Sequence, residues 1–190
     1  MRRFIKTIVM SAAVALVCAP SAARADGYFN PWAGVNFGSE LANGRGGFGV
    51  AAGSMGAGVA GGEVNFGYSP SFFGTSNDFG SNTVIDLMAN VIVGVPIGGQ
   101  RGPGFRPYVT AGLGLIRTQI DGGTVFNVQT SDNDFGWNAG AGVMGYFNDH
   151  VGLRGDVRYL RTLNGDIANS IDFDAGALHF WRTSFGLVIR

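Results

Sequence analysis

The chain is poor in cysteine and in charge, and these two shortages exclude several classes of protein. Its 190 residues include one cysteine, Cys18, and only 14% are Asp, Glu, Lys or Arg. A single thiol cannot build a disulfide scaffold or a cysteine-based metal site. After Ala25 no stretch has the roughly 18 apolar residues that a transmembrane helix needs. We therefore expect neither a disulfide-stabilised domain nor a helical membrane span.

The first 25 residues are typical of a secretory signal peptide. Three basic residues lie among the first six, and the apolar stretch from Ile8 to Cys18 is too short to span a bilayer as a helix. Ala23-Arg24-Ala25 then supplies small residues at the −3 and −1 positions of a cleavage site. We expect cleavage after Ala25 and a mature domain of residues 26–190. A lipid anchor on Cys18 is the alternative, which the bulk of Val17 disfavours.

Removal of this signal would leave an acidic domain. Four of the 13 basic residues lie in the signal and all 13 acidic residues follow it, so the mature domain has nine arginines, no lysine and a formal charge of −4. No basic patch remains for a nucleic acid. The sequence therefore predicts no nucleic-acid partner.

What the chain has in abundance is glycine, with 33 residues, and segments of alternating polarity. In residues 151–163, for example, Val151, Leu153 and Val157 alternate with charged residues. Clusters of Gly, Asn, Asp and Ser separate eight such segments, which is typical of β-strands joined by turns. The segments are 32–38, 46–55, 62–73, 83–97, 106–120, 134–147, 151–163 and 177–189.

The two faces of these segments indicate a membrane protein. The face opposite the apolar one holds Gly, Asn and paired charges, not the mixed Lys and Glu of a soluble surface. Longer and shorter connections broadly alternate, as they do in outer-membrane barrels. We therefore predict an all-β fold, an eight-stranded antiparallel up-and-down transmembrane β-barrel with both chain ends on the periplasmic side.

Six charged side chains fall on the face that would line the lumen. Buried charges persist only when they are paired and hydrogen-bonded, and the planar guanidinium of arginine suits a carboxylate partner. We interpret the set as a salt-bridge network that fills the lumen, with glycines on the same face leaving room for it. A gate or a narrow ion path is the alternative. The six residues are Glu63, Asp86, Arg154, Asp156, Arg158 and Arg182.

Aromatic residues near the strand ends predict two belts at the membrane interfaces, where Trp and Tyr are enriched. The predicted outer belt has Phe72, Trp137, Tyr159 and Trp181, and the predicted inner belt has Trp32, Phe105 and Phe147.

Three segments carry a family resemblance, namely 105–114, 137–143 and 148–159, the last an Asn-Asp turn that leads to a strand with an inward arginine. With them the mature chain resembles the small OmpA-type and opacity-protein-like outer-membrane β-barrels. The resemblance implies a protein of the Gram-negative cell outer membrane that contacts its lipid and is inserted by the barrel-assembly machinery. Members usually end in an aromatic residue, whereas this chain ends in Arg190.

No constellation of residues predicts catalysis, a cofactor or a metal ion. His179 and Ser184 would face opposite sides of one strand, and the acidic clusters lack calcium-loop spacing. We expect a monomeric protein, not an enzyme, that stabilises the envelope or binds a surface ligand through its extracellular loops. The main alternative is a small passive porin-like channel. An enzyme acting on outer-membrane lipid and a soluble periplasmic barrel for an apolar ligand also remain open.

Overall fold

The computed structural model describes residues 25–38, 41–73, 81–98, 102–121, 129–163 and 178–190. The predicted signal peptide, residues 1–25, lies outside this part of the chain except for Ala25. The part that is described contains no helix long and apolar enough to cross a membrane.

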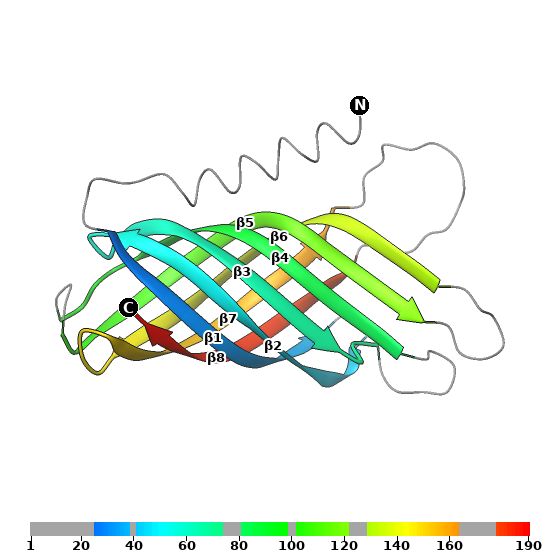
Figure 1. The fold of residues 1–190 in the computed structure, drawn as a ribbon, viewed down its shortest axis with the longest axis horizontal. Coiled ribbons are helices and arrows are strands. Elements are labelled where there is room, and N and C mark those ends of the chain that lie inside the picture. The colour runs from blue at the N-terminus through cyan, green and yellow to red at the C-terminus, as the bar shows by residue number, and fades with distance from the viewer. Residues whose placement is uncertain (1–24, 39–40, 74–80, 99–101, 122–128, 164–177) are drawn as a thin grey trace, which may run out of the picture.

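Eight antiparallel strands close into a barrel, so the predicted fold class is confirmed. Each strand pairs with the next one in the chain, and β1 pairs with β8 to close the sheet (Figure 1). The strands are β1 (Ala25–Gly38), β2 (Leu41–Gly56), β3 (Ala60–Pro70), β4 (Ser81–Gly94), β5 (Gly104–Asp121), β6 (Gln129–Tyr146), β7 (Val151–Thr162) and β8 (His179–Ile189).

The connections define two ends of the barrel. β2 joins β3, β4 joins β5 and β6 joins β7 at the end where β1 begins and β8 finishes, which we name the short-turn end (Figure 1, left). The remaining strand ends, such as the end of β3 and the start of β4, lie at the opposite end, which we name the loop end. The start of β1 and the end of β8 therefore both lie at the short-turn end, as an even number of strands requires.

Several strand boundaries differ from those predicted. β1, β2 and β6 begin earlier than predicted, at Ala25, Leu41 and Gln129. Antiparallel strands pair through backbone hydrogen bonds, so the pairing continues where apolar and polar side chains no longer alternate. β3 and β4 finish earlier, at Pro70 and Gly94.

The barrel is apolar outside and polar inside. Along β4, Leu87 and Val91 are 44% and 58% exposed, whereas Asp86, Met88 and Asn90, on the opposite face of the strand, are buried. An exposed apolar band around a polar interior is the pattern of a membrane barrel and the reverse of a soluble one.

Two apolar clusters fill the lumen on either side of its polar middle. An eight-stranded barrel is just wide enough to be packed in this way by side chains. The cluster near the short-turn end has Tyr28, Met55, Ile92, Tyr108, Met144, Tyr146 and Val188. The cluster near the loop end has Phe72, Val84, Met88, Ile116, Leu160 and Phe180.

Two of the predicted interface aromatics point into the lumen, so their assignment to the membrane surface is wrong. Phe72 is 1% exposed and packs edge-on against Phe180. It follows the end of β3, where Ser71 has a positive φ of 49°, so the alternation of the strand does not continue to it.

Trp32 is 6% exposed, and glycines make room for its indole. It pairs with Gly49 on one side and with Gly186 on the other. A Cβ atom at Gly49 would lie 2.6 Å from Cζ2 of Trp32 and 2.0 Å from the carbonyl oxygen of Phe66. The inward position of Trp32 thus depends on neighbours in two other strands, the next strand along the chain and the last one.

Replacing Gly49 should destabilise the barrel. We expect Gly49→Val to lower the free energy of unfolding by about 1–3 kcal/mol, the usual cost of overpacking. Urea titration of the folded protein in detergent, followed by heat modifiability on gels, measures it. Gly46→Val is the matched control in β2, since a Cβ there meets nothing within 4 Å. Equal stability of the two variants would contradict the packing described for Trp32.

Candidate functional site in the lumen

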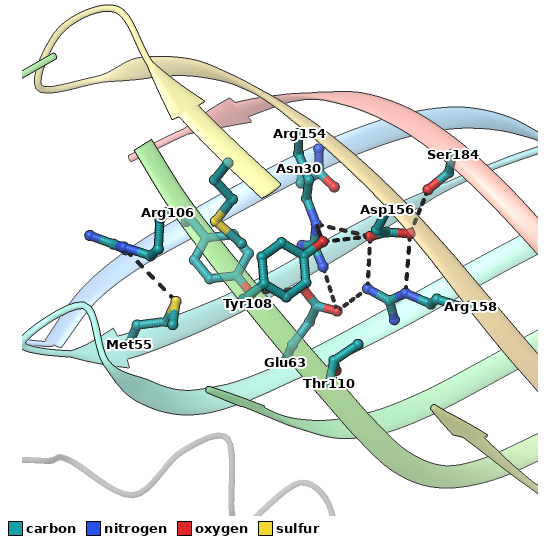
Figure 2. A network of polar contacts seen from close by, with 12 residues as sticks. Asn30, Met55, Glu63, Arg106, Tyr108, Thr110, Arg154, Asp156, Arg158 and Ser184 are labelled. Carbon is teal, nitrogen blue, oxygen red and sulfur yellow. Dashed lines mark hydrogen bonds and ion pairs between the residues drawn. The ribbon is translucent and has the colours of Figure 1, made fainter. Parts of the chain in front are cut away.

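Four of the six predicted lumen charges meet in one group, which we name the lumen charge cluster: Glu63 of β3 with Arg154, Asp156 and Arg158 of β7. Arg154 donates to both carboxylate oxygens of Glu63, from Nη1 to Oε2 and from Nη2 to Oε1 at 3.3 Å. Arg158 Nη2 lies 2.8 Å from Glu63 Oε1 and 3.2 Å from Asp156 Oδ2. Figure 2 shows these side chains directed toward one another across the lumen.

Hydroxyl groups complete the hydrogen bonding of the two carboxylates. Tyr28 donates to Glu63 Oε2 at 2.7 Å, and Tyr108 donates to Asp156 Oδ2 at 2.8 Å. Ser184 donates to the other oxygen of Asp156 at 2.9 Å. All four charged side chains are buried. Since each carboxylate has both cationic and hydroxyl donors, the lumen charge cluster meets the usual condition for keeping charge away from water.

Arg182 and Asp86 form a separate pair. Arg182 donates from Nη2 to Asp86 Oδ2 at 2.7 Å and from Nη1 to Oδ1 at 3.1 Å, a bidentate contact. Its Nε donates to Asn36 at 2.8 Å, and its guanidinium lies 4.9 Å from the ring centroid of Trp32. The structure therefore divides the six predicted residues into two groups.

Both groups connect opposite sides of the barrel. Glu63 lies in β3 and its two arginine partners lie in β7, four strands away around the closed sheet. Asp86 in β4 and Arg182 in β8 are separated by the same number of strands. Each group pairs as many guanidinium groups as carboxylates, so each is neutral within itself.

Glycines give these groups the space that they occupy. A Cβ at Gly67 would lie 2.3 Å from Asp86 Oδ2, and one at Gly142 would lie 2.5 Å from the Tyr108 hydroxyl oxygen. Residues without a Cβ at these two positions allow the charged side chains to lie across neighbouring strands.

The sequence reasoning missed three residues of the lumen. Tyr28 precedes the segment predicted as the first strand. Tyr108 lies in the predicted segment 106–120 but carries no charge, so it was not among the six predicted lumen residues. Arg106, two residues before Tyr108, is also buried, and the alternation of β5 is the signal that could have identified it.

The other predicted interface aromatics lie on the outer surface. Phe105 and Phe147 are exposed near the short-turn end. Near the loop end, Tyr159 lies between Trp137 and Trp181, with ring centroids 5.5 and 5.2 Å apart. That these rings lie at membrane interfaces stays a prediction.

The described residues offer little for catalysis. They hold no group of three or more His, Cys, Asp and Glu that could bind a metal ion. His179 is exposed on the outer surface, whereas Ser184 is buried in the lumen, so these two residues of β8 do not form a nucleophile–base pair.

Comparison with known proteins identifies the family. Residues 9–180 match the model of the outer membrane protein beta-barrel domain, whereas no curated protein sequence matches the chain. Among solved structures, the chain is similar to Neisserial surface protein A, with a TM-score of 0.63 and 16% identity over 87% of this chain and 97% of that one.

Two further solved structures share the fold. They are the N-terminal β-barrel domain of Pseudomonas aeruginosa OprF, with a TM-score of 0.54 and 17% identity over 87% of this chain and 98% of that one, and Yersinia pestis Ail, the attachment invasion locus protein, with a TM-score of 0.52 and 12% identity over 86% and 97%. From the match that spans most of its length, the chain belongs to the outer membrane protein beta-barrel domain family.

Proposed function

We propose that this protein is a monomeric structural or surface-interaction barrel of the Gram-negative outer membrane, with a lumen closed to solutes. Its family membership supports the location. The exposed apolar residues around the barrel support contact with outer-membrane lipid. Cleavage of residues 1–25 and insertion of residues 26–190 by the barrel-assembly machinery are part of the same proposal.

The observation that carries the closed lumen is the order of side chains along it. The lumen charge cluster lies between two buried apolar clusters, and the Arg182–Asp86 pair lies beside the one near the loop end. A permeating ion would have to pass both apolar clusters and separate guanidinium groups from their carboxylates. Both steps are unfavourable in a buried site. The filled lumen therefore favours the structural role over the alternative of a small passive channel.

A surface ligand remains part of the proposal. One solved structure of Ail is a complex with the heparin analogue sucrose octasulfate. The mature domain of this protein has a formal charge of −4, so a sulfated polyanion would be repelled. We therefore propose that any ligand of its extracellular loops is neutral or cationic.

Conductance separates the closed barrel from the channel. In planar bilayers we expect the inserted protein to give no steady conductance above that of the lipid, because the lumen is filled. Protein recovered from the same membranes should show the heat-modifiable band of a folded barrel, which controls for insertion. Reproducible single-channel steps from the folded protein would favour the channel instead.

Removal of one arginine from the lumen charge cluster should destabilise the barrel. We expect Arg154→Ala to lower the free energy of unfolding by about 3–5 kcal/mol, because Glu63 is left buried without its bidentate partner. The folded fraction after urea titration, read from heat modifiability, measures the loss. Arg161→Ala is the matched control, since Arg161 lies in the same strand on the outer surface. A folded fraction equal to that of Arg161→Ala would contradict the proposed role of the ion pairs.

The pair across the lumen should show coupling. In a double-mutant cycle, the combined Asp86→Ala and Arg182→Ala variant should lose less stability than the two single losses added together, by about 0.5–3 kcal/mol. Asp86→Ala combined with Arg161→Ala should be additive. Additive losses in both cycles would show that the bidentate contact of Arg182 contributes no pairwise energy.

A further inference from the structure

Arg106 differs from the other buried arginines because it has no carboxylate partner. It is 2% exposed. Within the described residues its one hydrogen bond is from Nη1 to the sulfur of Met55 at 3.7 Å, a weak acceptor, and its buried Nε has none. By contrast, Arg154, Arg158 and Arg182 all form ion pairs.

The numbers of buried arginines and carboxylates also leave Arg106 without a carboxylate partner. Among the residues that the structure describes, the buried charged side chains are four arginines and three carboxylates. The lumen charge cluster and the Arg182–Asp86 pair use all three carboxylates and three of the arginines. Arg106 is therefore the one buried positive charge that remains uncompensated, and such a charge is strongly unfavourable without an anion.

Arg106 lies beside a second arginine near the short-turn end of the barrel. It points toward the short-turn end, away from the lumen charge cluster (Figure 2). Its guanidinium carbon lies 5.5 Å from the ring centroid of Tyr146, and that of Arg190 lies 3.6 Å from the same centroid. Two guanidinium groups thus share one aromatic ring at this end of the barrel.

The surrounding groups leave the charge of Arg106 uncompensated. The turn between β2 and β3 packs against Arg106, so that a Cβ atom added at Gly58 would lie 2.5 Å from its Nη2. Asp26 interacts with it electrostatically but forms no ion pair with it, and Arg190 adds a second positive charge. An additional anion would satisfy the donors of Arg106.

We propose that Arg106, with Arg190, binds a phosphate group at the short-turn end of the barrel. A guanidinium group recognises phosphate through two parallel N–H donors. Inorganic phosphate has a charge of about −1.5 to −2 at neutral pH, and the phosphodiester of a phospholipid headgroup keeps one negative charge, so either supplies the anion that Arg106 lacks. The source is either a soluble phosphate or the headgroup of a phospholipid in the adjacent leaflet. This inference does not depend on whether the lumen conducts.

The first test is a titration with inorganic phosphate. Protein extracted from membranes into a maltoside detergent, which has no phosphate, is titrated with inorganic phosphate and with chloride at matched ionic strength. We expect a saturable rise of the unfolding temperature with phosphate alone. Arg106→Met should abolish this rise, and Arg190→Gln should weaken the affinity at least tenfold. An unfolding temperature that does not respond to phosphate, or a response that Arg106→Met retains, would overturn the proposal for a soluble phosphate.

A second arm supplies phospholipid in place of inorganic phosphate. Short-chain phosphatidylglycerol is added to the same maltoside solution, with added maltoside as its control. A rise of the unfolding temperature that Arg106→Met abolishes assigns the site to a lipid headgroup. The absence of a response in both arms rejects the phosphate site altogether.

The sign of the stability change provides an independent readout. Without phosphate, Arg106→Met should be at least as stable as the original protein, because it removes an uncompensated charge. Arg154→Met is the matched comparison and should be clearly less stable. If Arg106→Met loses as much stability as Arg154→Met, Arg106 already has a counter-ion within the protein and the proposal fails. A phosphate response that appears only in Asp26→Asn would identify Asp26 as that counter-ion, and would also overturn it.

Discussion

Buried ion pairs between opposite sides of the barrel are the interaction on which the rest of this structure depends. Glu63 bonds to Arg154 and Arg158 across the lumen, and Asp86 bonds to Arg182 in the same manner. A slip of one residue in any of these strands would turn the charge toward lipid and its apolar neighbours toward the lumen. The ion pairs therefore favour one register of the closed sheet, and they require small residues such as Gly67 and Gly142 beside them.

The proposed function follows from how the lumen is filled. Its polar middle is internally neutral, and apolar side chains pack on both sides of it. Such an interior has no obvious path for solutes and no catalytic arrangement among the described residues. In the proposed role, the surface that contacts other molecules is the outside of the barrel and its two ends. At the short-turn end, Arg106 is buried without the carboxylate partner that the other buried charges of the described residues have. This difference is the reason for proposing a ligand there.

Much of the fold could be predicted from the sequence, because period-two alternation reports which face each residue occupies. It predicted eight strands and the inward direction of Glu63 and Arg154. It could not predict which inward charges meet, because pairing across the lumen depends on the shear of the closed sheet. Phe72 was misplaced because a turn ends the alternation before it. Trp32 was misplaced because the glycines that accommodate it lie in two other strands.

Arg154, Arg158 and Arg182 should be held in ion pairs that exclude water. Hydrogen exchange of arginine side chains, followed by NMR on the protein in lipid nanodiscs, tests this most directly. The Nε protons of Arg154, Arg158 and Arg182 should exchange with water far more slowly than that of Arg161 on the outer surface. Exchange of all four at the same rapid rate would show a hydrated lumen and would contradict the closed barrel.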